Sequence, residues 1–185
     1  MPHRQPNTKR FLPKIWLMTD PRLGDGLLAA VRKLPVGSGI VFRNYQLATG
    51  DRLLLFLQIK RICRRRGHML VLAGQDDWRA DGVHGRARFR PTQILTMPVH
   101  SLREIRNAQK LGADMMFLSP VFSTRSHPRA RTLGVMQFSR LARLAGPAKV
   151  IALGGMTRNK AQTITNRIAY GWAGIDAFYA VRIRT

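Results

Sequence analysis

The chain has few acidic residues, a single cysteine and no long apolar run. Nine Asp and Glu stand against 32 Lys and Arg, giving a formal net charge of +23, and Glu104 is the only glutamate. The single cysteine, Cys63, excludes an internal disulfide and is typical of a reducing compartment, so we expect a buried structural thiol and a cytoplasmic protein. No segment reaches the roughly 18 apolar residues of a membrane span, which excludes a transmembrane helix.

The excess of positive charge allows three interpretations. A field of this sign attracts polyanions, so nucleic-acid binding is one of them. The sequence shows neither aromatic residues interleaved with basic ones nor zinc-finger spacing, which makes this the less favoured interpretation. Arginines spread over solvated helix faces are the simplest explanation, and attraction of small phosphorylated ligands is the third.

The length of 185 residues predicts one domain with a sizeable core. Residues 1–12 are basic and contain no apolar segment of the kind found in secretory signals, so we predict a disordered arm there. Residues 13–185 then form the domain.

Short apolar runs alternate with amphipathic stretches along this domain and predict a parallel α/β architecture. Asp51 is expected to cap a long helix that ends at Gly67, and Ser101 with Glu104 matches a capping box. The predicted strands are 14–20, 37–44, 69–74, 80–84, 92–100, 113–120, 148–155 and 173–180.

Eight such strands predict a (βα)₈ TIM barrel, with a doubly wound open sheet as the alternative. Only QDDWR separates the third strand from the fourth, and GRARFRP after the fourth is poor helix sequence. The barrel is therefore expected to be shortened, with helices reduced or missing after strands 3 and 4.

Two segments after strands look suited to a phosphate group. Gly154 and Gly155 lie between the seventh strand and a helix capped by Thr157, where backbone N–H groups and the helix dipole favour an anion. Thr124 and Ser126 follow the sixth strand in an arginine-rich loop, where hydroxyl and guanidinium groups can bind phosphate oxygens. A simple tight turn and a solvated surface loop are the respective alternatives.

Histidine and aspartate residues follow other strands. His100 ends the fifth strand and is a candidate general acid/base or a packed histidine; His84 is expected to be structural. Asp76 and Asp77, with Asp20 near the same end of the barrel, are candidate Mg²⁺ ligands, although loop capping is the commoner task of aspartate.

Five segments together resemble the family of thiamine phosphate synthases and their relatives, the thiazole tautomerases. The resemblance extends from Lys14 to Asp176, and it implies the TIM-barrel fold of that family. The segments, in order, are IWLMTD (15–20), ADGVH (80–84), VHSLREIRNAQKLGADMMFLSPVFSTRS (99–126), LGVMQFSRLARLAG (133–146) and KVIALGGM (149–156).

The resemblance implies that a thiazole phosphate lies against the loop after the sixth strand and the Gly-Gly turn. Thr124, Ser126, Gly154 and Gly155 carry those roles, and His127 stands where the family has a phosphate-binding lysine.

The pyrophosphate half of the synthase site departs from the family pattern. Arg43 of the Gln-x-Arg-x-Lys signature is retained, but Val41 and Tyr45 replace its Gln and Lys. GRARFR replaces a loop that ends in a metal-binding acid, and Pro98 replaces a serine. The family's Asn-Asp pair after the third strand corresponds to Gln75 and Asp76. Each charge-assisted contact that these replacements remove is worth about 1.5–3 kcal/mol.

The tautomerases bind a thiazole phosphate and move a proton with a histidine at the position of His100. We therefore expect binding of thiazole phosphate or a similar small phosphate ester, with His100 as acid/base and Arg43 neutralising the ligand. One alternative is a genuine synthase with Mg²⁺ at Asp76 and Asp77. Another is a non-catalytic barrel that binds nucleic acid or another polyanion.

Overall fold

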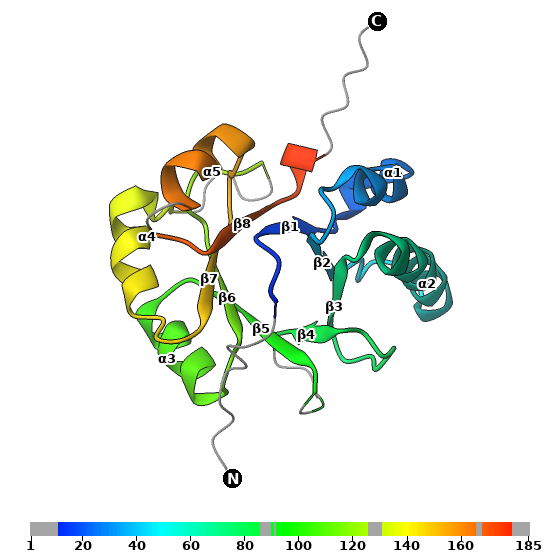
Figure 1. Ribbon diagram of the computed structural model, residues 1–185, viewed down its shortest axis with the longest axis horizontal. Helices are drawn as coiled ribbons and strands as arrows, with labels where there is room; N and C mark the ends of the chain where they lie inside the picture. Colours follow the sequence, from blue (N-terminus) through cyan, green and yellow to red (C-terminus); the bar gives the residue numbers. More distant parts are fainter. Residues whose placement is uncertain (1–10, 86–89, 91, 126–130, 166–167, 179–185) are drawn as a thin grey trace, which may run out of the picture.

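Eight parallel strands form a closed barrel in sequential order, and β8 pairs with β1 to complete it (Figure 1). The computed structural model describes residues 11–85, 90, 92–125, 131–165 and 168–178. The predicted TIM barrel is thus confirmed. The strands are β1 (Ile15–Met18), β2 (Gly39–Phe42), β3 (Met69–Ala73), β4 (Gly82–His84), β5 (Ile94–Val99), β6 (Met115–Leu118), β7 (Lys149–Ala152) and β8 (Gly171–Gly174).

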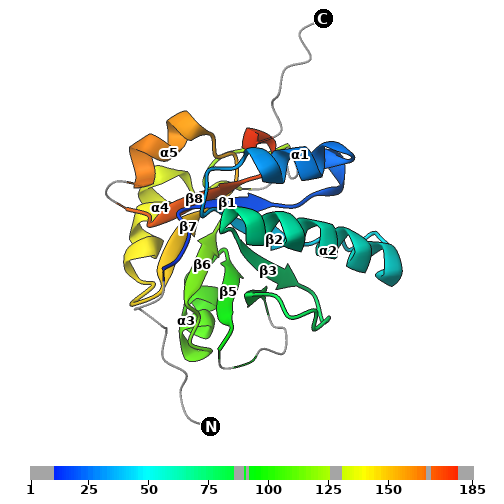
Figure 2. The same ribbon diagram turned by 45° about the vertical axis from the view of Figure 1, so that its right-hand side comes forward.

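Among the described residues, helices cover two sides of the barrel and leave a third side without one. The α-helices of the described residues are α1 (Gly26–Lys33), α2 (Thr49–Arg66), α3 (Leu102–Lys110), α4 (Gly134–Arg143) and α5 (Arg158–Thr165). Helices α1 and α2 lie side by side, and α3, α4 and α5 lie on the opposite side (Figures 1 and 2).

The connection from β3 to β4 contains no helix, as predicted, and the described residues between β4 and β5 contain none either. Across the described part of the chain, no helix is both long enough and apolar enough to span a membrane.

The strands are mostly shorter than predicted, and the ends of several other segments also differ from the sequence prediction. Helix α2 begins at Thr49, so Asp51 lies within its first turn and does not cap it. Strand β8 ends at Gly174 instead of continuing to residue 180, because the chain then turns into a 3₁₀ segment, η2 (Asp176–Phe178). Leu12, at the end of the predicted arm, is buried, and its carbonyl accepts a 2.6 Å hydrogen bond from Tyr170; residues 1–10 lie outside the described residues.

The two other predicted helix starts are confirmed. Ser101 Oγ accepts from the N–H of Glu104 and so caps α3. The Glu104 carboxylate accepts from the N–H of His100, one residue before the cap, so the reciprocal bond of the predicted capping box is shifted by one residue. Thr157 Oγ1 accepts from the N–H of Lys160 at 3.3 Å at the start of α5.

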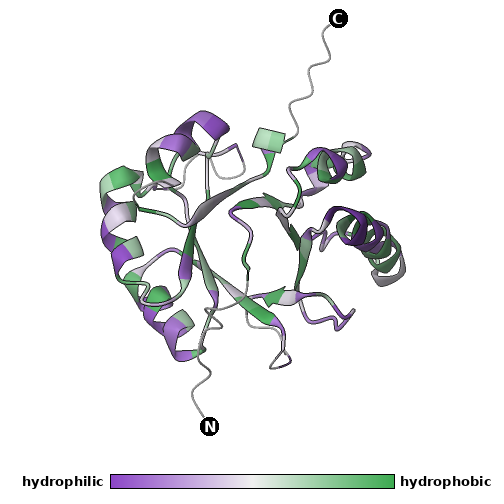
Figure 3. Ribbon diagram, in the orientation of Figure 1, coloured by the Kyte–Doolittle hydropathy of each residue, from purple (hydrophilic) through white to green (hydrophobic). Residues whose placement is uncertain are grey.

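The core has three parts: the barrel interior, the layer under α1 and α2, and the layer under α3, α4 and α5. Hydrophobic residues form much of the strands, whereas the helices carry both hydrophobic and hydrophilic residues (Figure 3). Cys63 lies on the buried face of α2, and burial raises the pKa of its thiol to about 12, with the charge of Asp81 adding to the effect. The expected burial of this thiol is confirmed.

Trp16 fills the barrel interior and packs edge-on against Phe117, with ring centroids 5.3 Å apart. The indole requires a glycine on the neighbouring strand, because a Cβ at Gly39 would lie 2.3 Å from the Trp16 ring. A close-packed interior cannot absorb that methyl group without shifting the strands.

Gly39→Ala is expected to reduce the free energy of unfolding by about 1–3 kcal/mol through overpacking of the interior. Urea denaturation measures the change. Gly50→Ala is the control, because a Cβ at this exposed position in α2 meets nothing within 4 Å and alanine favours a helix. Equal stabilities for Gly39→Ala and the wild type would contradict this account of the interior.

Candidate functional site at the barrel mouth

The segments that follow the carboxyl ends of the strands form one rim, which we call the mouth. In a closed parallel barrel these ends all lie on the same face, which is where TIM barrels place their chemistry. Polar contacts link neighbouring segments around most of this rim.

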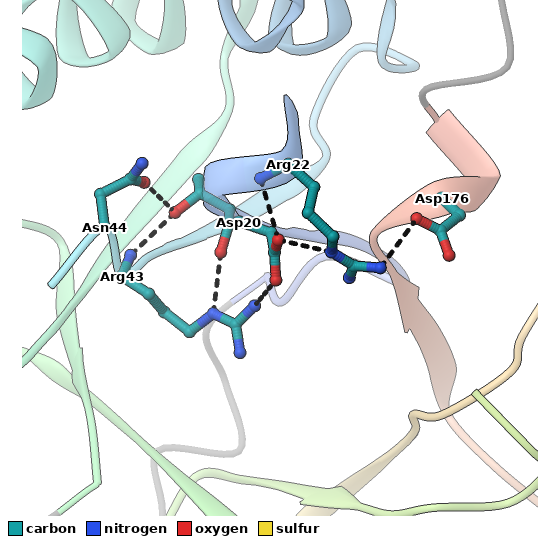
Figure 4. Close-up of polar contacts among 6 residues, drawn as sticks. Asp20, Arg22, Arg43, Asn44 and Asp176 are labelled. Carbon is teal, nitrogen blue, oxygen red and sulfur yellow. Dashed lines mark hydrogen bonds and ion pairs between the residues drawn. The ribbon is translucent and has the colours of Figure 1, made fainter. Parts of the chain in front are cut away.

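A network of two arginines and two aspartates joins the ends of β8, β1 and β2 (Figure 4). Arg22 Nε donates to Asp20 Oδ1 at 2.7 Å and its Nη1 lies 3.7 Å from Asp176 Oδ1. Arg43 donates from Nε to the carbonyl of Thr19 at 2.8 Å and from Nη2 to Asp20 Oδ2 at 3.3 Å. Asp20 is therefore shared by two guanidinium groups.

The electrostatics of this network follow from burial and from paired charges. Burial opposes ionisation of Asp20, but hydrogen bonds from Arg22 and the charges of Arg22 and Arg43 outweigh it and lower its pKa. Burial lowers the pKa of Arg43, and Asp20 partly offsets this effect. Arg43 Nη1 has no hydrogen-bond partner among the described residues, so it can serve an anionic ligand.

A third guanidinium, that of Arg52, lies at the ends of β2 and β3. It donates from Nε to the Arg43 carbonyl at 2.9 Å, from Nη2 to the Ala73 carbonyl at 2.6 Å, and from Nη1 to the carboxylate of Asp76. Asp77 instead forms a surface ion pair with Arg90 at 2.7 Å. The two aspartates predicted as metal ligands thus have different cationic partners, and the described residues contain no group of three His, Cys, Asp or Glu side chains that could hold a metal ion.

His84 ends β4 and is held in one tautomer. The Thr96 hydroxyl donates its proton to the Val83 carbonyl at 3.1 Å, so the 2.9 Å contact with His84 requires Nδ1 to donate to Thr96 Oγ1. Desolvation, together with the charge of Arg43, lowers the pKa of His84 from 6.5 to about 3. The neutral ring stands edge-on to Phe117, consistent with the predicted structural role.

His100 lies at the end of β5 and contacts the end of β6. Its Nδ1 is 2.8 Å from the carbonyl oxygen of Ser119. A carbonyl only accepts, so Nδ1 carries a proton and, in the neutral ring, Nε2 carries the lone pair. The His100 side chain is exposed, so this nitrogen is accessible to a ligand.

The Gly-Gly turn packs directly on the loop after β6. The N–H of Phe122 donates to the Gly154 carbonyl at 3.1 Å, and a Cβ at Gly155 would lie 2.3 Å from the Ser123 carbonyl oxygen. Both glycines have positive φ, 96° and 59°. Within the described ranges, no acceptor is found for the N–H groups of Gly154 and Gly155.

Lys160 is a cation at this turn that the sequence analysis missed. Its Nζ donates to the Gly155 carbonyl at 3.2 Å and lies 4.6 Å from the centroid of the Phe122 ring. The sequence feature that could have identified Lys160 is its position three residues after the Thr157 cap, which places it in the first turn of α5.

The structure groups the predicted residues on two sides of the mouth. His100, Gly154 and Gly155 lie on the β5–β7 side, in contact with the loop that leads to Thr124. Arg43 belongs to the β8–β2 side. Ser126 and His127 lie outside the described residues, so their phosphate-binding roles stay predictions.

His84→Gln is expected to make the free energy of unfolding less dependent on pH. Because the folded state binds a proton only near pH 3 and the unfolded state near 6.5, wild-type stability falls as pH decreases through this window. The free energy of unfolding of the wild type and of His84→Gln should be measured from pH 7 to pH 4. The difference between the two proteins at each pH removes the contributions of the other titratable groups. Parallel curves would show that His84 is not the source.

Comparisons with known proteins agree with this architecture. A family model described as thiamine monophosphate synthase matches residues 17–178. The chain is 30% identical over 183 residues to a candidate thiamine-phosphate synthase 2 of Aquifex aeolicus, covering 90% of this chain and 98% of that one. It is 25% identical over 182 residues to a thiamine-phosphate synthase of Coprothermobacter proteolyticus, covering 89% and 86%.

Among solved structures, the thiamine phosphate pyrophosphorylase of Pyrococcus furiosus superposes with a TM-score of 0.78 at 24% identity, covering 92% of this chain and 90% of that one. This similarity shows a shared fold. The family match over residues 17–178 and the 30% identity to the Aquifex aeolicus protein identify the chain as a member of the thiamine monophosphate synthase family.

Proposed function

We propose that the protein binds a thiazole phosphate, or a closely similar phosphate ester, at the β5–β7 side of the mouth and transfers a proton within it through His100. The observation that carries the proposal is the position of His100. Its Nδ1 is fixed on the Ser119 carbonyl, and Ser119 belongs to the segment that packs on the Gly-Gly turn.

The phosphate would lie at the Gly154–Gly155 turn. Two glycines there allow the backbone to approach an anion closely, and the N-terminus of α5 adds a favourable dipole. Lys160 supplies a positive charge beside the Gly155 carbonyl. Thr124 lies in the adjacent loop, within the described residues, and its hydroxyl could add a hydrogen bond to a phosphate oxygen.

Proton transfer needs a base that is oriented before the ligand arrives. The Nδ1–H bond to Ser119 at 2.8 Å leaves Nε2 of His100 as the accepting atom. Nε2 removes a proton from one atom of the ring system, and the resulting imidazolium returns a proton to another. No atoms are gained or lost, so the net reaction is an isomerisation.

The synthase reaction is the second candidate, because the curated relatives carry that name. In this reaction Arg43 would hold a pyrophosphate group on the β8–β2 side, and Asp76 and Asp77 would have to hold Mg²⁺. The contacts of both aspartates with arginines make this candidate the weaker one.

Polyanion binding is the third candidate. A surface hollow of about 540 Å³ on α2, away from the mouth, is lined by Leu57, Lys60, Arg61, Arg64 and Arg65. Binding of RNA or DNA there would weaken steeply with salt and would not respond to thiazole phosphate.

His100→Gln is expected to lower kcat for isomerisation of a phosphorylated thiazole tautomer by about 10²–10⁴-fold, because the base is lost, while KM stays nearly unchanged. Lys160→Met is the matched variant, and it should raise KM with a smaller effect on kcat. Proton NMR in D₂O follows both turnover and deuterium incorporation. Turnover retained in His100→Gln would contradict the role of His100 in the mechanism. A KM for Lys160→Met equal to that of the wild type would contradict the role of Lys160 at the phosphate site.

A further inference from the structure

Arg52 is a buried cation with three oxygen acceptors in three different segments. Its guanidinium binds the Arg43 carbonyl after β2, the Ala73 carbonyl at the end of β3, and the Asp76 carboxylate in the loop beyond. A charge that contacts one carboxylate and two carbonyl oxygens has the ligand types that a hard divalent cation takes in proteins.

Aromatic rings enclose this guanidinium. Its central carbon lies 5.3 Å, 5.4 Å and 4.8 Å from the ring centroids of Phe42, Tyr45 and Trp78, respectively. The Arg52 side chain is only 7% exposed, whereas the Asp76 side chain is 34% exposed. Arg52 thus forms a permanent, desolvated part of the mouth.

The residues at this position do not fit a magnesium ion. Asp76 contacts the Arg52 guanidinium, and a cation bound to the same carboxylate would stand beside a fixed positive charge. Asp77 contacts Arg90, and the segment from Gly85 to Arg90 contains no acidic residue. The acid that would complete a metal site on the β4 side is therefore missing.

We propose that the guanidinium of Arg52 takes the place of a divalent cation at the β2–β3 side of the mouth. It neutralises Asp76, joins the two strand ends and holds the main chain of Arg43, so that Arg43 binds an anion without a metal. Arg52 is a positioning residue, since it acts through Arg43 and Asp76. The inference does not depend on the proton transfer at His100.

The first test is Mn²⁺ binding to the full chain, measured by electron paramagnetic resonance at about physiological ionic strength. We expect no saturable site in the wild type at sub-millimolar metal. Asp76→Asn should lower Tm by roughly 5 °C or more, because it leaves the buried Arg52 without its carboxylate. Asp77→Asn is the matched control and should leave Tm nearly unchanged, since its ion pair is exposed. A saturable Mn²⁺ site that Asp76→Asn abolishes would overturn the proposal.

The second test is calorimetric titration with inorganic pyrophosphate, in EDTA and in excess Mg²⁺. We expect binding in EDTA that is at least as tight as in excess Mg²⁺, because Mg²⁺ complexes free pyrophosphate, and loss of binding in Arg43→Gln. Arg52→Lys keeps the charge but cannot reach all three acceptors, so it should weaken binding about 5–10-fold. Binding only with Mg²⁺, no binding in either buffer, or unchanged affinity in Arg52→Lys would each contradict the proposal.

Discussion

Pairing of β8 with β1 is the constraint on which the rest of the molecule depends. Ile15, Trp16 and Leu17 align with Trp172, Ala173 and Gly174, and this register closes the sheet. Closure places the carboxyl ends of all eight strands on one rim. The described candidate residues of the mouth, from Asp20 after β1 to Asp176 after β8, belong to segments that this closure brings to the same rim.

The scarcity of acidic residues gives the mouth its particular character. Four of the nine acidic residues, Asp20, Asp76, Asp77 and Asp176, are paired with arginines at the mouth. A protein with few carboxylates has little with which to coordinate a metal, and it has abundant guanidinium groups to replace one. Guanidinium groups bind phosphate with defined geometry, so a basic mouth can hold a phosphorylated ligand directly.

The sequence predicted the barrel because strand and helix patterns alternate with little interruption. The same patterns predict the end of β8 wrongly, because the apolar run continues after Gly174 into η2. There Phe178 stacks on Trp172, with ring centroids 5.0 Å apart. The local sequence does not distinguish a strand from such a turn, and only tertiary contacts decide between them. Aspartate favours the N-cap position, so the sequence predicts a helix cap at Asp51, although α2 begins two residues earlier.

Parts of the site were visible in the sequence for a related reason. His100 and the Gly154–Gly155 pair each follow a strand directly, so local order alone places them at the mouth. Arg52 gave no such signal, since an arginine in a basic helix is expected to face solvent. Its burial depends on aromatic residues contributed by separate segments, and no local pattern predicts that enclosure.

The most direct test of the central claim is calorimetric titration of the full chain with thiazole phosphate in EDTA, at about physiological ionic strength, repeated with Mg²⁺. The account predicts saturable one-to-one binding of equal affinity in the two buffers, because the chain's own cations and backbone donors hold the phosphate. Binding that appears only with Mg²⁺, or no binding at all, would contradict it.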